Sequence, residues 1–335
     1  MSRPARAGAT VALAGAVAFA YGSLVERRSF VLRELTMPVL PAGSPDIRVL
    51  HLSDLHMAPW QHDKQRWVRA LAALEPDLVV TTGDNLGHRD GLAGLEAAYD
   101  GFRGVPGVYV WGSNDYTGPQ LKNPLRYFAG PSRNDDPGEA LDVAALGAYL
   151  DGLGWASLNN TATRMTIRGV EFEFFGVDDP HRGYDRLDLM DAGLRDVELT
   201  DGELTDGEFR DGELTAEGGG HRAAEGSMTW RSDGDIVRIG VAHAPYRRIL
   251  DAFVDRGADA IFAGHTHGGQ VCVPGFGALV TNCDLPRAQA AGQSTWGFGG
   301  HSALLHVSAG LGTSIYAPVR FACPPEATLL TLTAG

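Results

Sequence analysis

The chain of 335 residues contains little cysteine and no concentration of positive charge. Its three cysteines are scattered and lack CxxC spacing, which argues against a disulfide framework and against a thiolate metal site. They are predicted to be small buried core residues. The formal net charge is −13, and the sequence has no basic stripe. Binding of extended nucleic acid depends on basic side chains that neutralise phosphates, so the chain is not expected to bind it.

Much of the negative charge is confined to one segment and therefore says little about the substrate. Residues 196–217 hold nine acids and one arginine, in a tandem pentapeptide of the type Asp-Gly-Glu-Leu-Thr. The unit is too short for a solenoid and lacks the ligand spacing of an EF-hand calcium loop. We interpret residues 196–220 as an acidic low-complexity insertion, a mobile loop without a catalytic role.

Long apolar runs are also scarce, and the one candidate lies at the N-terminus. Ala7–Leu24 is uncharged, rich in alanine, valine and glycine, and preceded by Arg3 and Arg6. Three interpretations are open: an uncleaved signal-anchor, a cleaved signal peptide with its site at 18–20, and a buried helix. We expect residues 1–37 to be a membrane anchor or signal segment with a linker. The protein is then predicted at the cell membrane with a single N-terminal span, on a side that the flanking charges do not determine.

From residue 46 onward the pattern changes to short apolar strands that alternate with amphipathic helices. This rhythm predicts an α/β domain over residues 46–335, with a mostly parallel core sheet and crossover helices. The expected strands are 47–52, 77–81, 108–111, 170–177, 236–242, 260–263, 303–307 and 328–332.

Side chains that bind metals follow these strands directly. Because the carboxyl ends of the strands in an open α/β sheet line one crevice, we expect the loops to converge there. Two carboxylates, one amide and four imidazoles suit a pair of divalent ions such as manganese, iron or zinc. The predicted metal ligands are Asp54, His56, Asp84, Asn114, His243, His265 and His267.

Paired metals about 3.5–4 Å apart need a bridging carboxylate and share a water that they convert to hydroxide. Asp84 is the best candidate for the bridge, because the preceding Gly83 permits a close approach of the backbone. The isolated histidines are predicted to be structural or solvated; they are His51, His62, His88, His181 and His306.

In this order the motifs resemble those of the calcineurin-like metallophosphoesterases. That family shows Asp-x-His, Gly-Asp, Gly-Asn-His-(Asp/Glu), a lone histidine and Gly-His-x-His, and the resemblance covers roughly residues 46–333. The opening Leu-Ser-Asp-Leu-His at 52–56 is similar to a branch of membrane-associated bacterial phosphoesterases. The resemblance implies a four-layer α/β/β/α sandwich and a metal-dependent phosphatase or phosphodiesterase.

The resemblance also implies how the ligands divide. Asp54, His56, Asp84 and His267 would hold one metal, and Asp84 would be shared with the second. His243, His265 and an amide from the third motif would complete the second site.

The third motif departs from the family pattern. In Gly112-Ser113-Asn114-Asp115, serine stands where the family has its ligand asparagine, and asparagine stands where it has histidine. Since serine is a poor ligand, we expect Asn114 to reach the second metal through a one-residue shift of the loop. Asn114 cannot act as an acid, and Asp115 could do so only with a raised pKa, so substrates with good leaving groups are expected. Asp84, Asn114 and Asp115 are the candidate catalytic residues.

The leading hypothesis is hydrolysis of a phosphodiester or pyrophosphate, with a phosphorylated small molecule or a lipid-linked phosphate as substrate. A phosphomonoesterase and a metal-binding scaffold that has lost catalysis are the alternatives, and a nuclease is a weaker option. Arg320 lies in a loop expected near the metals, where it is either a phosphate-steering group or an ordinary surface arginine.

Overall fold

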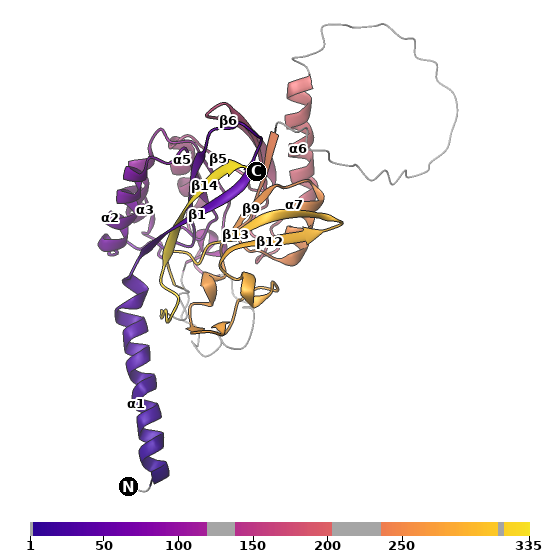
Figure 1. Ribbon diagram of the computed structural model, residues 1–335. Helices are drawn as coiled ribbons and strands as arrows, with labels where there is room; N and C mark the ends of the chain where they lie inside the picture. The colour runs from indigo at the N-terminus through magenta and orange to yellow at the C-terminus, as the bar shows by residue number, and fades with distance from the viewer. Residues whose placement is uncertain (1–2, 119–137, 203–235, 314–317) are drawn as a thin grey trace, which may run out of the picture.

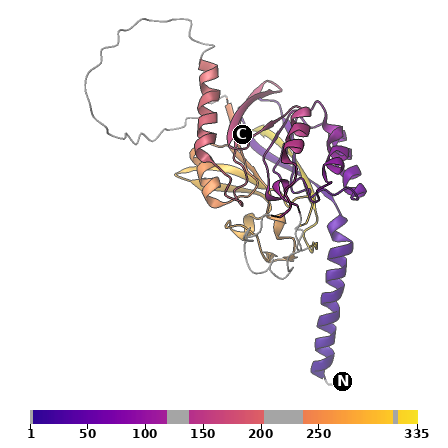
Figure 2. The ribbon, with the colours of Figure 1, turned by 180° about the vertical axis from the view of Figure 1, so that it is seen from behind.

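The computed structural model describes residues 3–118, 138–202, 236–313 and 318–335, in which two six-stranded sheets pack face to face (Figure 1). The first sheet has the order β1-β14-β2-β3-β4-β5, and the second has the order β12-β13-β9-β8-β7-β6. Helices cover the outer face of each sheet, as Figure 2 shows from behind. The predicted α/β/β/α sandwich is confirmed.

The first sheet is built mainly from parallel neighbours, and β14 runs antiparallel to β2. Its strands are β1 (Val31–Leu40), β2 (Ile47–Leu52), β3 (Leu78–Thr81), β4 (Gly107–Tyr109), β5 (Trp155–Ser157) and β14 (Glu326–Ala334). The helices on its outer face are α2 (His62–Ala70), α3 (Leu92–Tyr99) and α5 (Val143–Gly152).

Four neighbouring strands of the second sheet are parallel, and the outer two of these each form an antiparallel hairpin with an edge strand. Its strands are β6 (Thr161–Ile167), β7 (Val170–Gly176), β8 (Ile236–Val241), β9 (Ala260–Ala263), β12 (Gly292–Phe298) and β13 (His301–Val307). Helices α6 (Leu187–Gly202) and α7 (Arg247–Asp255) cover it, and β10 (Cys272–Val273) and β11 (Gly277–Ala278) form a small separate hairpin.

The central strands are apolar because the sandwich buries them on both faces. Between the sheets, Val49 and Val80 face Phe172 and Phe262, all of them fully buried. Separate apolar clusters fill the layers between each sheet and its helices. The core therefore holds the carboxyl ends of β2, β3, β8 and β9 rigidly in place.

The domain begins earlier than the boundary predicted at residue 46. Strand β1, which overlaps the predicted anchor segment and linker, pairs in parallel with β14, with Val31 opposite Glu326. Pro38 did not interrupt the strand because β1 is the edge of the sheet, where one side of the backbone has no strand partner to lose.

The N-terminal helix α1 (Arg3–Leu24) extends away from the sandwich (Figures 1 and 2). Leu13 and Phe19 on it are 66% and 64% exposed, so α1 is not the buried helix of one interpretation. Among the described residues no helix is long and apolar enough to cross a membrane. The predicted membrane span is therefore wrong; alanine and glycine, which dominate this run, add little to the free energy of transfer into lipid.

The acidic repeat begins inside a helix and not in a loop. Helix α6 continues through Asp196 to Gly202, covering the first part of the predicted insertion. Residues 203–220 of that prediction lie outside the described part of the chain.

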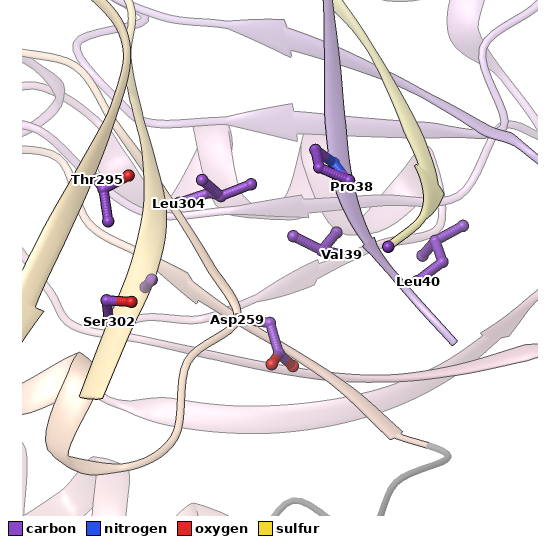
Figure 3. Close-up of a pocket in the computed structure, with 9 residues that line it drawn as sticks. Pro38, Val39, Leu40, Asp259, Thr295, Ser302 and Leu304 are labelled. Atoms are coloured by element: carbon purple, nitrogen blue, oxygen red, sulfur yellow. The ribbon is translucent and has the colours of Figure 1, made fainter. Parts of the chain in front are cut away.

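A shallow groove of about 330 Å³ lies between the edge of the first sheet and the β12–β13 hairpin (Figure 3). Pro38 and Leu40 line one side, Thr295 and Leu304 line the other, and Asp259 also lines the groove. Asp259 directly precedes β9, so the groove lies at the amino end of that strand. The candidate ligands follow its carboxyl end and are therefore remote from the groove.

Candidate metal centre

All the predicted ligands lie just past the carboxyl ends of strands. Asp54 and His56 follow β2, Asp84 follows β3, and Asn114 lies in the short helix α4 (Ser113–Tyr116) after β4. From the second sheet, His243 follows β8, and His265 and His267 follow β9, with His267 opening a 3-10 turn. The loops of both sheets meet there, as the strand-end argument predicts.

The first group of ligands is compact and buried. The ligand atoms of Asp54, His56, Asp84 and His267 all lie within 4.8 Å of one another. His56 Nε2 is 3.2 Å from His267 Nε2 and 3.5 Å from Asp84 Oδ2, and His267 Nε2 is 3.6 Å from Asp54 Oδ1. Atoms about 2.1 Å from one tetrahedral metal lie roughly 3.4 Å apart, so this donor set fits a divalent ion.

A second group adjoins the first through Asp84. His243 Nε2 is 3.6 Å from Asp84 Oδ1 and 3.2 Å from His265 Nδ1. Asp84 thus turns one oxygen toward His56 and the other toward His243. This is the arrangement that a bridging carboxylate needs.

The ligand backbones are strained. Five candidate ligands have positive φ values without being glycine: Asp54 (50°), His56 (42°), Asp84 (54°), His265 (68°) and His267 (51°). Such conformations cost about 1–3 kcal/mol each and persist where the surroundings enforce them. Their concentration here sets this edge of the sandwich apart as a functional site.

Glycine lets the β3 and β4 loops approach each other. A Cβ on Gly112 would lie 2.3 Å from Asp84 Oδ1, and a Cβ on Gly83 would lie 2.4 Å from Gly112 N. Any side chain at either position would push Asp84 away from His243. The expected close approach at Gly83 is therefore observed.

Hydrogen bonds fix which nitrogen of each imidazole faces the site. His243 Nδ1 donates to the Thr82 carbonyl at 2.7 Å, and His265 Nε2 donates to the Asn282 carbonyl at 3.2 Å. The other two nitrogens, His243 Nε2 and His265 Nδ1, face each other at 3.2 Å, within hydrogen-bond distance. Asp54 Oδ1 is buried without a hydrogen-bond partner, which leaves that oxygen available to a metal.

Burial keeps most of the imidazoles neutral. It lowers the pKa of His56 to about 4 and holds the pKa of His265 and His267 well below 6.5. Burial also opposes charge on His243, but nearby carboxylates, foremost Asp84, outweigh it and raise its pKa to about 9. Neutral imidazoles are the ligating form, and the same carboxylates that charge His243 attract a metal cation.

The altered third motif brings Asn114 to Asp84. The Asn114 side chain lies 2.6 Å from Asp84 Oδ2, and its backbone N–H donates to Asp84 Oδ1 at 2.7 Å. Ser113 turns away from this position and donates to the buried Asp179. The amide of Asn114 is therefore the group of this motif that reaches the candidate centre, although its role as a ligand stays a prediction.

Asp115 faces the backbone. Its carboxylate accepts hydrogen bonds from the N–H groups of Asn85 (2.7 Å), Leu86 (3.1 Å) and Gly112 (3.0 Å). Burial raises its pKa to about 7. Those donors bind the β3 and β4 loops together, so this geometry favours a role in holding Asp84 and Asn114, and the predicted catalytic role stays a prediction.

Sequence reasoning missed two residues beside the second group. His181 was expected to be structural or solvated, but its ring centroid is 4.6 Å from that of His265 and its Nδ1 is 2.9 Å from the Tyr246 hydroxyl. Asp179 is fully buried and accepts from the His181 backbone at 2.8 Å. Both follow β7, so the rule that located the other candidates would have found them.

Arg320 is fully buried, so it is neither a phosphate-steering group nor an ordinary surface arginine, the two roles expected from the sequence. Its guanidinium donates to the carbonyls of Ala309 (2.7 Å), Gly310 (3.0 Å) and Gly312 (2.6 Å), and lies 3.5 Å from His267 Nδ1. A Cβ on Gly310 would lie 2.7 Å from Asp54 Cβ, so this loop packs directly on the ligand. Arg320 braces the loop and is not free to contact a phosphate.

The sequence model described as calcineurin-like phosphoesterase matches residues 47–269. Since this match spans more than half of the chain, the protein belongs to the calcineurin-like phosphoesterase family. It is thus a phosphoester hydrolase, and the cluster of Asp54, His56, Asp84 and His267 supports metal dependence.

Solved structures show more distant likenesses. TT1561 of Thermus thermophilus is 12% identical, with 80% of this chain and 91% of that chain covered and a TM-score of 0.41. A dimetal phosphatase from Danio rerio is 11% identical, with 82% of this chain and 88% of that chain covered and a TM-score of 0.37. The NAD nucleotidase of Haemophilus influenzae is 11% identical, with 80% of this chain but 46% of that chain covered and a TM-score of 0.40.

These TM-scores are below 0.5, so the likenesses carry no argument about activity. The comparison with curated proteins gave no significant match. The finer placement in a membrane-associated bacterial branch has no support among these comparisons.

Proposed function

We propose that the protein hydrolyses a phosphodiester or a pyrophosphate in a phosphorylated small molecule, with two divalent metals at the candidate centre. The observation that carries the proposal is the position of Asp84. Its two oxygens face two different sets of histidines, at 3.5 Å from His56 and 3.6 Å from His243. One carboxylate between two imidazole sets suits a shared ligand of a metal pair.

The protein's own groups would hold and orient the metals. Asp54, His56 and His267 would complete the first site, and His243, His265 and Asn114 would complete the second. Bound divalent metals would supply Lewis acidity toward a phosphoryl oxygen and lower the pKa of a water. Backbone carbonyls accept from His243 Nδ1 and His265 Nε2, so the other nitrogen of each ring is the one that would bind a metal.

The third motif supports the choice of substrate class. Asn114, which lies against Asp84, has no acidic proton that it could transfer to a departing alkoxide. A leaving group that departs as a stabilised anion needs no such proton, and phosphate or an aryl oxide meets this condition. We therefore favour activated diesters and pyrophosphates over alkyl monoesters.

The test uses the full chain, stripped of metal and reloaded with Mn²⁺, on bis(4-nitrophenyl) phosphate and 4-nitrophenyl phosphate. We expect faster turnover of the diester. Asp84→Asn should abolish it, while His301→Asn, at an exposed histidine of β13, should retain it. Faster turnover of the monoester would replace this proposal with a phosphomonoesterase, and metal binding without any turnover would favour the scaffold.

A further inference from the structure

A continuous line of hydrogen bonds leads from Asp54 into the core between the sheets. The Ser53 hydroxyl donates to Asp54 Oδ2 at 2.5 Å, and the Thr82 hydroxyl lies 2.6 Å from that of Ser53. His51 Nε2 lies 3.0 Å from the Thr82 hydroxyl, and His51 Nδ1 lies 2.8 Å from His306 Nδ1. Three side chains therefore connect a candidate metal ligand to a histidine on the opposite sheet.

The line is closed to water. Ser53, Thr82 and His51 are fully buried and His306 is 1% exposed. Ser53 and His51 come from the β2 segment and Thr82 follows β3, whereas His306 belongs to β13 of the second sheet. Each polar atom must find its partner inside the protein, because an unpaired buried donor is costly.

Counting protons fixes the direction of every bond. The Asp54 carboxylate can only accept, so the single proton of Ser53 points to it. Thr82 must then donate to Ser53, and His51 Nε2 must donate to Thr82. A neutral His51 has no second proton, so its Nδ1 accepts from Nδ1 of His306.

Two further observations agree with this direction. Burial lowers the pKa of His51 well below 6.5 and that of His306 to about 3, which leaves one ring proton on each. The count leaves His306 Nε2 as a bare lone pair, and this atom has no hydrogen-bond partner. A buried lone pair at the end of the line avoids the larger cost of an unpaired N–H.

The line ends by distinguishing the two oxygens of Asp54. Oδ2 accepts from Ser53 and from the backbone N–H of His265 at 2.9 Å. Oδ1 has no partner and lies 3.6 Å from His267 Nε2, inside the first ligand group. The carboxylate is thereby held with one oxygen anchored and the other directed at the metal.

The backbone leaves room for this line. A Cβ on Gly264 would lie 1.9 Å from the Ser53 hydroxyl, 2.6 Å from Asp54 Oδ2 and 2.9 Å from the Thr82 hydroxyl. No side chain at position 264 is compatible with the three polar atoms. The β9 loop thus closes over the line without displacing it.

We propose that Ser53, Thr82, His51 and His306 form a positioning relay, which sets the orientation of Asp54 toward the first metal from the opposite sheet. The proposal goes beyond the proposed function, on which it rests only in requiring that a metal binds. Outer groups of this kind typically contribute about 10- to 100-fold to metal affinity.

The first test is the tautomer of each histidine, measured by ¹⁵N NMR of histidine-labelled, metal-free full chain at pH 7.5. We expect a proton on Nε2 of His51 and on Nδ1 of His306. The opposite tautomer on either residue would overturn the relay. This readout involves neither metal nor substrate, so it stands even if the proposed function fails.

The second test measures Mn²⁺ affinity by calorimetry on the metal-free protein. Ser53→Ala and His51→Leu should weaken it about 10- to 100-fold. His51→Gln, whose amide can still donate toward Thr82, should retain most of the affinity, which a purely space-filling role of His51 would not explain.

Thr328→Val is the matched control. Thr328 lies opposite His51 on β14 and its buried hydroxyl has no hydrogen-bond partner, so the variant should bind Mn²⁺ like the parent. Equal affinities for His51→Leu and His51→Gln would overturn the proposal, as would a loss in Thr328→Val equal to that in Ser53→Ala. Thermal unfolding of each variant checks folding, and the two His51 variants decide the matter if Ser53→Ala does not fold.

Discussion

The two ligand sets that share Asp84 are supported in different ways. In the first set, side chains provide the support: Ser53 holds Asp54, and Arg320 braces the loop against it. In the second set, backbone carbonyls hold His243 and His265. The first set therefore depends on particular side chains and can be weakened by single substitutions, whereas the second depends mainly on the fold of its loops.

The sets also differ in how they match the family pattern. All the family ligands of the first set are present. The second set would need Asn114, which comes from a motif in which serine and asparagine replace asparagine and histidine. The departure from the family pattern therefore lies in the second set, whose histidines are held by backbone carbonyls.

Asp84→Asn should have the largest effect, because it removes the group common to both sets. We expect kcat/KM on an activated diester to fall about 10³-fold or more, since several kcal/mol of metal-dependent stabilisation are lost. Metal content by elemental analysis should fall with it. Asp63→Asn, at an exposed carboxylate of α2, is the control, and an active Asp84→Asn enzyme would refute the shared centre.

Arg320→Met should break the first set selectively. Several buried carbonyls lose their donor, and we expect a destabilisation of about 3–5 kcal/mol in urea unfolding. Arg33→Met is the matched control; Arg33 is 51% exposed and pairs with Glu326, so its loss should cost about 0–1 kcal/mol. Equal stabilities of the two variants would show that Arg320 does not brace the loop.

Restoring the family motif in the second set should change which leaving groups the enzyme accepts. The double substitution Ser113→Asn with Asn114→His supplies an acid beside the centre, and we expect turnover of a poor, alkyl leaving group to rise about 10²-fold. Turnover of nitrophenyl esters should change much less, because nitrophenolate leaves without a proton. Equal effects on both substrates would remove the argument from leaving groups.

Asn114→Ala should affect the second set more than the first, which loses only the contact of the amide with Asp84 Oδ2. We expect the affinity for the more weakly bound Mn²⁺ ion to fall about 10- to 100-fold, while the affinity for the more tightly bound ion is kept. Ser113→Ala serves as control, since its hydroxyl faces Asp179. Unchanged metal content in Asn114→Ala would contradict the predicted role of its amide.

The last prediction concerns His306 and the stability of the protein against pH. Its pKa is about 3 in the folded chain against 6.5 in the unfolded one, so below pH 6.5 only the unfolded chain takes up the proton. The free energy of unfolding should fall by about 1.4 kcal/mol per pH unit between pH 6.5 and 3 on this account. In His306→Asn, urea unfolding at pH 7 and pH 5 should show a smaller difference than in the parent.

The strand-end rule explains what the sequence could predict. A short apolar run followed by Asp, His or Gly marks both a buried strand and its loop, so the positions of Asp54, Asp84 and His265 follow from local sequence. The same rule applied to β7 would have added Asp179 and His181. Both were passed over because they lack a family motif.

Other features depend on contacts that local sequence does not contain. Strand β1 is defined by its pairing with β14, almost 300 residues later in the sequence. Pro38 within it makes the local sequence look unlike a strand. Arg320 is a charged residue, which normally lies at the surface, and its burial depends on a ring of carbonyls formed only in the folded loop. The orientation of Asn114 depends on how α4 sits against Asp84.

The position of β14 between β1 and β2 has a consequence for synthesis of the protein on the ribosome. Val31 of β1 pairs with Glu326, so β1 has no partner on this side until about 295 further residues have been translated. At about 5–20 residues per second, that interval is roughly 15–60 s. Throughout it the outer edge of β2 remains open, next to the loop that carries Asp54 and His56. The nascent chain therefore exposes a strand edge beside the candidate metal ligands, and the pairing of β14 with β1 and β2 covers that edge and prevents wrong strand pairing there.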